Sequence, residues 1–513
     1  MTNFGQSPQA RNLLNARISR IPLRIADIDS AHMQKILLVN PPAFIEETYS
    51  RYAMGAPELP PLGLAYVASM VRQDHDVRIL DCVARRMGLR QFCEEVRRWS
   101  PDIVAFTSTT ISYLKAVRCM EEVKRIDPGI VTVLGGVHIN AAAEQTMGEN
   151  AGKLDFGVIG EGEHTFKSLV DAIDRERPSD SISGTAYYRD NSPRFNAPSP
   201  QIATVDTLPF PSRDLFGDPS QYAQTVTRST KGKGLSLNAI TSRGCPYSCT
   251  YCDQWMFGRK WRAHSPDYVL REVDHLVNDF NVRHISFEDD TFTIIKKRTL
   301  EICRLLEERK YDLSFNICAR VETLDDETLS WLKRAGCFTI FMGIESGDPE
   351  MLDFIHRPSR EAVSKGVKRI RSHGIKVYGS FILGFPKETR QSARNTIEFA
   401  KSLDVDSVSF NVFTPYPMTE LARIAPEHGE FLSDWKYYSD HAPRRPFVPH
   451  TWTEKELLEL QRQAYKEFYM RPKTILANLS RLREPRFLVN GLAALKMFYF
   501  DTIQVEGIGA DAC

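Results

Sequence analysis

The sequence predicts an α/β protein in which a doubly wound parallel sheet precedes a partial barrel of six βα units and a helical C-terminal region. Short, continuously apolar runs alternate with segments of helical period, which is typical of parallel strands that helices cover on both faces. A polar, proline-rich interval divides this pattern into two series. The length of 513 residues suits about three domains, and the 42% hydrophobic and 26% charged content is that of a globular protein.

These changes of pattern divide the chain into five parts. We expect a polar N-terminal extension with at most one short helix over residues 1–34, the doubly wound domain over 35–175 and a linker over 176–235. The partial barrel covers 236–440, and a helical region rich in aromatic residues covers 441–513. The linker prediction depends on prolines among polar residues, including Pro193, Pro198, Pro200, Pro209, Pro211 and Pro219.

The first domain is predicted to contain five parallel strands with helices between them. The predicted strands are the apolar runs 36–39, 77–80, 103–106, 130–134 and 156–159, and helical periodicity marks 64–71, 89–99, 114–126 and 164–173. In a doubly wound sheet, ligands bind beyond the carboxyl ends of the strands, where the strand order switches. We therefore expect a ligand crevice among the loops that follow these strands.

The second series contains six predicted strands. They cover residues 238–241, 284–287, 314–318, 339–342, 377–381 and 407–412, with helices at 269–280, 298–308, 326–335, 360–372 and 389–403. Six βα units of this kind predict a partial barrel, and the loops at the carboxyl ends of its strands are where function is expected.

Charge and hydropathy exclude several classes of function. The chain has 66 Lys+Arg against 65 Asp+Glu, so its formal charge of +1 gives no global attraction for nucleic acid, and we expect no nucleic-acid partner. No stretch approaches the roughly 18 apolar residues of a membrane span. Because the first residues also lack the basic and apolar parts of a secretory signal, we expect a cytoplasmic protein.

Three of the ten cysteines, Cys245, Cys249 and Cys252, lie within eight positions directly after the first predicted barrel strand. Three thiolates with the spacing C-x3-C-x2-C can hold three corners of an iron–sulfur cube and leave one iron open. A structural zinc ion needs a fourth ligand, and the nearest candidates, Asp253 and His264, lack the spacing of a second ligand pair. The other seven cysteines are dispersed, and we expect them to be small buried side chains.

This loop, with Tyr251 just before its last cysteine and the first strand of a six-unit barrel before it, resembles the radical S-adenosylmethionine (SAM) superfamily. The resemblance implies that Cys245, Cys249 and Cys252 ligate a [4Fe–4S] cluster whose open iron binds the amino and carboxylate groups of SAM. One-electron reduction then cleaves SAM and yields a 5′-deoxyadenosyl radical. The resemblance also implies an electron donor such as flavodoxin or ferredoxin.

The ends of the later strands resemble the same family. An acidic triplet follows the second strand, where the family often carries Gly-Gly-Glu and binds the methionine ammonium, and carboxylates suit a cation. The resemblance implies SAM contacts at six residues: Glu288, Asp289, Asp290, Arg320, Glu345 and Gly384. Without the resemblance, the triplet is interpreted as a solvated acidic turn and Arg320 as a surface arginine.

The first domain, followed by this barrel, resembles the cobalamin-dependent members of the superfamily and would be a Rossmann-like cobalamin-binding domain. Its landmarks are Asn40–Pro42, Pro60–Ala65, Gly135–His138 and Gly160–Glu163. Glycines allow backbone to approach the corrin edge and the nucleotide tail. The implied cobalamin contacts are Gly135, Gly136, His138, Gly160, Glu161 and Gly162. Without the resemblance, His138 is interpreted as a hydrogen-bonded turn histidine.

The sequence departs from one cobalamin pattern. Cobalamin mutases and methionine synthase carry Asp-x-His-x-x-Gly, whose histidine replaces the lower axial base on cobalt. The loop of residues 41–63 contains no histidine, and His75 has the wrong spacing and precedes a strand. We therefore expect cobalamin without its own base and without a histidine on cobalt, a form that suits homolytic methyl transfer.

The resemblance predicts a C-methyltransferase that acts on an unactivated carbon of a biosynthetic intermediate, with one SAM to remethylate cobalamin and a second to supply the radical. One alternative is an oxidative cyclase or ring-rearranging enzyme like the anaerobic magnesium-protoporphyrin monomethyl ester cyclases. A tRNA methylthiotransferase would need a second, N-terminal cysteine triad, and a non-catalytic metal-binding module is the last alternative. The sequence contains no evident acid–base pair, so catalytic residues beyond the cofactor ligands stay unassigned.

The segment 471–500 combines basic and apolar residues. Its six basic residues, against the single acid Glu484, are Arg471, Lys473, Arg481, Arg483, Arg486 and Lys496. A basic helix with aromatic residues is typical of helices that lie on a membrane surface. This interpretation predicts a large, partly apolar substrate, such as a lipid or tetrapyrrole, met at the inner face of the membrane. The alternative is a terminal helix pair packed on the barrel with a solvated basic face.

Overall fold

The first sheet has seven strands, five of which are the predicted parallel ones. The computed structural model describes residues 33–42, 59–175, 179–222, 234–438 and 444–479. The parallel strands are β1 (Lys35–Asn40), β2 (Asp76–Asp81), β3 (Ile103–Thr107), β4 (Val131–Gly135) and β5 (Phe156–Val158). Their order, β2-β1-β3-β4-β5, switches between β1 and β3, which confirms a doubly wound sheet. The ligand crevice expected at that switch stays a prediction.

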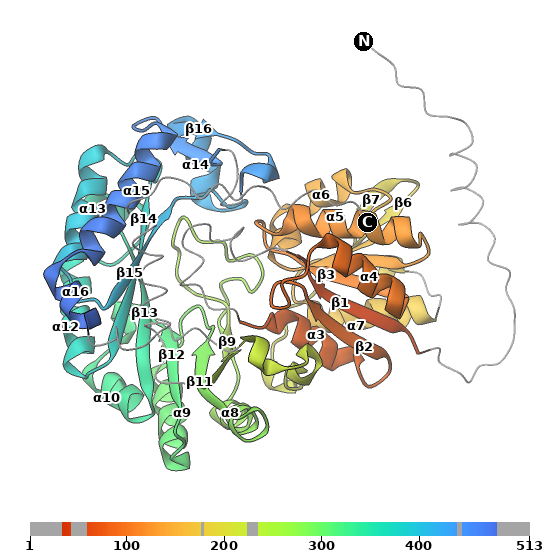
Figure 1. Ribbon diagram of the computed structural model, residues 1–513, viewed down its shortest axis with the longest axis horizontal. Coiled ribbons are helices and arrows are strands. Elements are labelled where there is room, and N and C mark those ends of the chain that lie inside the picture. The colour runs from red at the N-terminus through yellow and green to blue at the C-terminus, as the bar shows by residue number, and fades with distance from the viewer. Residues whose placement is uncertain (1–32, 43–58, 176–178, 223–233, 439–443, 480–513) are drawn as a thin grey trace, which may run out of the picture. The chain divides into compact units, whose positions relative to one another are not determined.

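Helices cover both faces of the parallel part of this sheet (Figure 1), which explains why most of those parallel strands are apolar. They are α3 (Leu62–Val71) and α7 (Gly162–Asp174) on one face, and α4 (Leu89–Trp99), α5 (Tyr113–Ile126) and α6 (Val137–Glu149) on the other. In β1, Ile36 and Leu38 point into the core beneath α3 and α7. Leu37 and Val39 point into the core beneath α4 and α5.

The interval predicted as a linker contains a hairpin that extends the first sheet. β6 (Thr185–Arg189) pairs antiparallel with β5, and β7 (Ser192–Phe195) pairs antiparallel with β6. Asp190 and Asn191 join these strands with φ values of 51° and 58°, the left-handed pair that a type I′ turn requires. Pro193, which indicated a linker, lies in the edge strand β7, a position where proline is tolerated. The linker prediction is therefore wrong for residues 185–195.

The second sheet contains the six predicted barrel strands, all parallel, in the order β15-β14-β13-β12-β11-β8. They are β8 (Leu235–Ala239), β11 (Val282–Phe287), β12 (Ser314–Cys318), β13 (Cys337–Glu345), β14 (Lys376–Leu383) and β15 (Ser407–Val412). Along the outside of this curved sheet in Figure 1 are α8 (Pro266–Phe280), α9 (Lys296–Arg309), α10 (Asp326–Arg334), α12 (Arg360–Ser372) and α13 (Arg390–Ser402). The short α11 (Pro349–Phe354) follows β13. The sheet is an open half-barrel, as predicted.

The outer edge of the half-barrel, β15, is covered by α15 (Glu454–Tyr469). The Phe410 N–H donates to the Tyr465 hydroxyl (3.0 Å), and the Gln461 amide donates to the Phe410 carbonyl (2.8 Å). The Tyr469 hydroxyl accepts from the Val408 N–H (3.1 Å) and donates to the Val408 carbonyl (2.8 Å). Side chains of α15 thus satisfy backbone groups that an open strand edge would otherwise expose.

The remaining described elements belong to the C-terminal part of the chain. They are α14 (Glu420–His428), the antiparallel pair β16 (Gly429–Phe431) and β17 (Phe447–Pro449), and α16 (Pro472–Leu479). Within the predicted helical C-terminal region, the described residues form α15 and α16 and also the short strand β17, which the prediction did not include. The N-terminal extension up to residue 32 and the segment 480–513 lie outside the described residues. None of the helices in the described ranges is long and apolar enough to cross a membrane.

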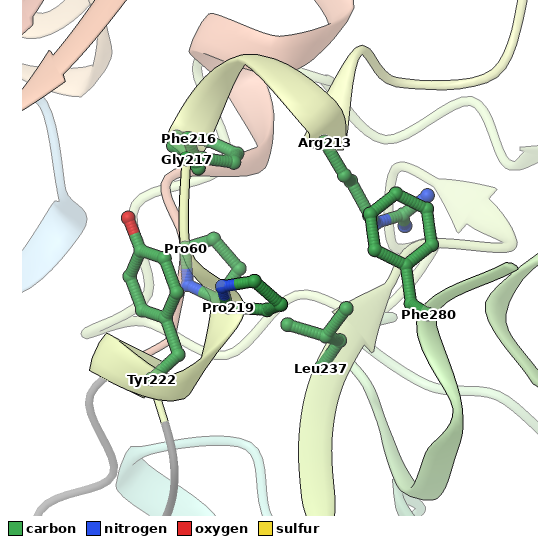
Figure 2. A pocket seen from close by; sticks show the side chains of 8 residues that line it. All are labelled: Pro60, Arg213, Phe216, Gly217, Pro219, Tyr222, Leu237 and Phe280. Atoms are coloured by element: carbon green, nitrogen blue, oxygen red, sulfur yellow. The ribbon is translucent and has the colours of Figure 1, made fainter.

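A small cavity lies where the linker packs against β8 (Figure 2). Its volume of about 10 Å³ has room for one water molecule and not for a cofactor. Arg213 in its wall forms a buried ion pair with Glu272 (2.7 Å) and donates to the Asn238 carbonyl (2.7 Å). The lining residues are Pro60, Arg213, Phe216, Gly217, Pro219, Tyr222, Leu237 and Phe280. This contact fastens the linker to the first barrel strand.

Candidate functional site

The cysteine loop begins just after the carboxyl end of β8. Two strands of two residues each pair at the base of this loop and close it. β9 (Ser242–Arg243) pairs antiparallel with β10 (Arg262–Ala263), so the cysteines lie in the loop between them. Gly244 has a φ of +83°, and a Cβ there would lie 2.5 Å from the Lys260 carbonyl oxygen, so this turn requires glycine. The Cys245 N–H donates to the Gly258 carbonyl (3.2 Å), which fixes the first cysteine to the returning strand of the loop.

Two arginines approach the middle cysteine. Arg320 Nη1 and Arg357 Nη1 lie 3.3 Å and 3.4 Å from the Cys249 sulfur. Two guanidinium groups beside one sulfur are charged donors that suit an anionic metal–sulfur group at this cysteine. Within the described ranges, no three His, Cys, Asp or Glu side chains converge on a single metal ion. An iron–sulfur cube does not require its cysteines to converge on one metal ion, because each cysteine binds a different iron atom of the cube.

Buried polar atoms without partners lie beside the same cysteine. Among the described residues, Arg320 Nε, Arg357 Nε and Glu345 Oε2 have no hydrogen-bond partner. Because buried polar groups are nearly always paired, such atoms mark a place where a polar ligand is expected. Guanidinium groups suit a carboxylate and an anionic cluster, and a carboxylate suits an ammonium. The residues present therefore fit a [4Fe–4S] cluster with the amino-acid part of SAM beside it.

The acidic triplet after β11 is divided between two environments. Asp289 is buried and accepts from the Thr241 N–H (2.6 Å), the Thr241 hydroxyl (2.6 Å) and the Ser242 hydroxyl (2.7 Å). Glu288 and Asp290 are exposed, although desolvation by the surrounding protein raises the pKa of both carboxyls. Asp289 therefore holds the start of the cysteine loop, and its two neighbours are the carboxylates available to a cation.

The end of β13 also contacts the cysteine loop. Glu345 is buried with a φ of +69°, a left-handed conformation that is uncommon for residues other than glycine and often occurs at functional sites. Its Oε1 accepts from the Tyr251 hydroxyl (3.0 Å), and desolvation raises the pKa of its carboxyl. Arg320, at the end of β12, stacks on the Tyr247 ring at 3.9 Å. Residues at the ends of β12 and β13 thus contact the two tyrosines of the cysteine loop, Tyr247 and Tyr251.

The turn after β14 is held by a hydrogen bond to a buried carboxyl group. Gly384 has a φ of +83°, and its N–H donates to the Glu388 carboxyl. A Cβ at Gly384 would lie 3.0 Å from Leu457 of α15, so glycine also permits this close packing. Glu388 is completely buried, and desolvation raises its pKa to about 8.

Glu388 is expected to make the stability of the protein depend on pH. Its pKa is about 8 in the folded chain against about 4.5 for an ordinary glutamate. Its contribution to stability is therefore complete below pH 4.5 and is lost as the pH rises through 8. Glu388→Gln removes this loss, and we expect it to raise the melting temperature at pH 9 by roughly 10 °C relative to the parent protein. At pH 6 the two proteins should differ much less. The same gain in Glu427→Gln, a change at an exposed helix position, would contradict the assignment.

The loops after β3, β4 and β5 form one hydrogen-bonded rim. Gly136 has a φ of +96°, and a Cβ there would lie 2.7 Å from the Ser108 carbonyl oxygen. Asn140 donates to the Gly136 carbonyl (2.8 Å) and accepts from the Gly160 N–H (2.6 Å). The rim brings together five of the residues predicted to contact cobalamin: Gly135, Gly136, Gly160, Glu161 and Gly162. It lies at the carboxyl edge of the sheet, where the fold predicts a ligand.

His138 is fully buried in an aromatic stack. The Tyr113 ring lies parallel to it at 3.8 Å, and the Trp435 ring meets it edge-on at 4.6 Å. Its Nδ1 lies 3.3 Å from the Thr110 hydroxyl, and desolvation lowers its pKa to about 3. His138 lies in the first turn of α6 and not in a loop turn, and a neutral, enclosed ring of this kind fits a structural role better than a contact to a cofactor edge.

The two residues considered as a fourth zinc ligand have other partners. His264 Nδ1 lies 3.0 Å from Asp206, and its ring stacks on Tyr268 at 3.8 Å. The Asp253 carboxylate accepts from the Trp255 N–H (3.1 Å). These contacts favour the iron–sulfur interpretation of the loop.

Several residues of this site have no clear signal in the sequence. Arg357 lies in an aperiodic loop after α11, and only the folded chain brings it to Cys249. Arg243 precedes the cysteines directly, yet its partner Glu163 is 80 positions away. Trp435, which contacts His138, comes from the short helical turn after β16, far from His138 in the sequence. Such contacts join segments that local patterns do not connect.

Comparison with known proteins agrees with this geometry. Residues 239–400 match the Radical SAM superfamily, and residues 54–170 match the B12 binding domain. An uncharacterized methyltransferase of Pyrococcus horikoshii is 37% identical over 451 residues, which are 87% of this chain and 95% of the relative. The anaerobic magnesium-protoporphyrin IX monomethyl ester cyclase of Rubrivivax gelatinosus is 27% identical, over 88% and 81% of the two chains. The solved structure of TsrM from Kitasatospora setae, a radical SAM methyltransferase with cobalamin and a [4Fe–4S] cluster bound, has a similar fold, with a TM-score of 0.67, 17% identity and coverage of 88% and 90%.

Proposed function

The chain belongs to the radical SAM enzymes that carry a B12-binding domain, and we propose that it transfers a methyl group to an unactivated carbon of a biosynthetic intermediate. It is an enzyme of the cobalamin-dependent, methyltransferase-like branch, and its cofactors are a [4Fe–4S] cluster, SAM and cobalamin. When bound, these groups supply a 5′-deoxyadenosyl radical for hydrogen abstraction and a methyl group for transfer. The protein's part is to bind, orient and shield the reactants.

One observation carries this proposal: three successive strand ends contact the cysteine loop. Asp289 after β11 binds Thr241 and Ser242, Arg320 after β12 approaches Cys249, and Glu345 of β13 binds Tyr251. A loop tied to three strand ends is held at the mouth of the half-barrel. That is where the chemistry of βα folds is placed.

We assign roles to residues on the same geometry. Cys245, Cys249 and Cys252 would hold the cluster, and Arg320 and Arg357 would bind the SAM carboxylate beside it. Glu288, Asp290 and Glu345 are the acids placed to meet its ammonium, and the Gly384 turn would lie along its adenosine. Asp289 would act through the loop, because all its hydrogen bonds in the structure go to Thr241 and Ser242.

Anaerobic reconstitution tests the proposal. The full-length chain, incubated with iron, sulfide and hydroxocobalamin, is expected to retain about four iron atoms per chain, the content of one cube, and one cobalt. With dithionite and SAM it should release 5′-deoxyadenosine. A chain that binds iron but never cleaves SAM would instead support the non-catalytic metal-binding module.

We propose that cobalamin binds at the rim formed by the loops after β3, β4 and β5, with no histidine on cobalt. Electron paramagnetic resonance of the Co(II) form is expected to lack superhyperfine splitting from an axial nitrogen. The spectrum of His138→Phe should be the same, because His138 is enclosed between Tyr113 and Trp435. Clear nitrogen splitting in the parent protein would refute this proposal, and its loss in His138→Phe would identify His138 as the ligand.

A second candidate function is oxidative cyclisation with the same cofactors. The observation that favours it is the 27% identity to an anaerobic magnesium-protoporphyrin IX monomethyl ester cyclase, over 88% of this chain. The two functions differ in the fate of the SAM methyl group, which reaches the product only in the methyltransferase.

We propose a flavodoxin or ferredoxin as the electron donor, and the exposure of Cys252 supports access to the cluster from the surface. Reduction of the cluster by flavodoxin in place of dithionite should support release of 5′-deoxyadenosine.

We further propose a partly apolar substrate met at a membrane surface. The described part of the basic segment favours the packed alternative, because Arg471 stacks on Phe468 at 3.7 Å and Lys473 pairs with Asp404 at 2.5 Å. Arg481, Arg483 and Arg486 lie outside the described residues. If they bind lipid, the full chain will float with phosphatidylglycerol vesicles at low salt, and changing all three to Gln will abolish flotation. Parent protein that stays in the soluble fraction would contradict the proposal.

A further inference from the structure

Two arginines and two glutamates are buried together where the cysteine loop meets the first sheet. Arg262 binds Glu161 through both of its terminal nitrogens, at 2.6 Å and 3.0 Å. Arg243 binds Glu163 at 2.5 Å and lies 3.6 Å from Glu161. The exposed fractions of these four side chains are between 2% and 7%. The charges balance, two against two, and they are hidden from solvent.

The arginines belong to the hairpin that carries the cysteine loop. Arg243 of β9 and Arg262 of β10 are directly paired residues, so two like charges face each other across the hairpin. The carboxylates of Glu161 and Glu163 supply the negative charge that compensates this repulsion. Glu161 and Glu163 come from the start of α7, directly after the loop of Gly160 that belongs to the proposed cobalamin rim. The charge cluster therefore joins the cysteine hairpin to that rim.

The hairpin is anchored on both of its sides. Successive residues of a strand point in opposite directions. The Ser242 hydroxyl binds Asp289 in the half-barrel (2.7 Å), and the next residue, Arg243, points to the first sheet. The Arg243 guanidinium also lies between the rings of Tyr66 in α3 and Phe257 in the cysteine loop, at 5.3 Å and 5.2 Å. Cys245 follows two residues later.

Buried ion pairs are seldom the most stable choice for an interface, because desolvation offsets much of their attraction. What such a pair does well is to define a single arrangement, since removing one partner leaves an uncompensated charge. A charge cluster between two cofactor-bearing domains, directly before the first cluster ligand, is suited to define their relative position.

We propose that Arg243 is a positioning residue, held by Glu163 and Glu161, that fixes the cysteine loop relative to the cobalamin-binding sheet. The inference rests on the proposed function in one respect, because it assigns a purpose to the fixed distance between the two cofactors. SAM cleavage at the cluster needs only the half-barrel. Methyl transfer from SAM to cobalamin needs the half-barrel and the cobalamin-binding domain in one fixed relative position. Displacement of reacting groups by about 1 Å can reduce such a rate about a hundredfold.

The test compares Arg243→Lys and Glu163→Gln with a control that breaks another buried ion pair. Glu272→Gln removes the partner of Arg213, a pair with 1% exposure on each side that fastens the linker and contacts no residue between Cys245 and Cys252 in the structure. Hydrogen exchange is first measured on the full chain without SAM or cobalamin. We expect amides of residues 244–252 to exchange about tenfold faster in both hairpin variants and at the parent rate in Glu272→Gln.

Two activities of the reconstituted protein are then compared. Release of 5′-deoxyadenosine with dithionite is expected to stay within about threefold of the parent. Formation of S-adenosylhomocysteine from SAM and cob(I)alamin, kept reduced by titanium(III) citrate, should fall at least about tenfold. Arg243→Lys keeps the positive charge but loses the planar guanidinium group with its several N–H donors. Because the charge is kept, we expect this variant to fold, so that its two activities can be compared with those of the parent.

Unchanged exchange in residues 244–252, or equal loss of both activities, would overturn the positioning role. So would a Glu272→Gln control that shows the same pattern as the hairpin variants. Because the exchange experiment contains neither SAM nor cobalamin, its outcome is independent of the proposed function. A chain that cleaves no SAM would refute that function and leave the exchange result to decide the role of Arg243 in holding the loop.

Discussion

Replacing any one of Cys245, Cys249 and Cys252 with alanine is expected to reduce 5′-deoxyadenosine formation to background. Loss of a residue that only supports a metal ligand typically costs 10–100-fold, so loss of a ligand itself should cost more than about a hundredfold. The three cysteines lie on one loop between β9 and β10, and no other cysteine is within eight positions of them in the sequence. No substitute ligand is therefore close along the chain.

Iron content, the absorbance of the reconstituted protein and the rate of 5′-deoxyadenosine release measure this effect. Cys303→Ala is the matched control, since Cys303 is a buried thiol in α9 and belongs to the hydrophobic core. It should lose some stability and keep both iron and activity. A Cys249→Ala protein that releases 5′-deoxyadenosine at the parent rate would show that the loop is not the cluster site.

Asp289→Ala is expected to have the second-largest effect, on both stability and cluster content. The carboxylate accepts three hydrogen bonds from Thr241 and Ser242, and its removal leaves a buried backbone N–H and two hydroxyls unpaired. Removal of such a buried acceptor costs about 3 kcal/mol. A loss of that size lowers the melting temperature of a large domain by roughly 6–12 °C. Because the same bonds hold the start of the cysteine loop, the protein should also incorporate less iron.

The neighbours of Asp289 provide its controls. Glu288→Gln and Asp290→Asn change exposed carboxylates and should leave the melting temperature of the apoprotein nearly unchanged. If these two acids bind the SAM ammonium, the affinity for SAM should fall in the reconstituted protein. Equal stability in all three variants would mean that Asp289 does not anchor the loop.

The acidic triplet illustrates how far the sequence predicts this site. Three adjacent carboxylates after a strand predict an acidic loop at the barrel mouth, and the structure places them there. Which of the three faces inward depends on Thr241 and Ser242, 47 to 48 positions earlier in the chain. Local periodicity carries no information about contacts at that separation, so the division of the triplet is visible only in the folded chain.

The strands were more accessible to prediction than the contacts between domains. Most of the parallel strands of the first sheet are short apolar runs, because burial on both faces favours that composition. The β6–β7 hairpin was missed because its strands are polar and its turn, Asp190-Asn191, lies among prolines that indicate a linker. The pairing of Arg243 with Glu163 joins two charged residues that are ordinary surface residues by composition. Only burial of both side chains distinguishes them.

The most direct test of the methyltransferase assignment follows the methyl group of SAM. The reconstituted protein is incubated with trideuteromethyl-labelled SAM, reductant and an extract of cells that lack the gene, and the products are compared by mass spectrometry with those of a Cys245→Ala incubation. The assignment predicts a compound that carries the intact trideuteromethyl group, formed by the parent protein and absent with Cys245→Ala. Release of 5′-deoxyadenosine together with a Cys245-dependent product that contains no label would contradict it and support the cyclase-like alternative.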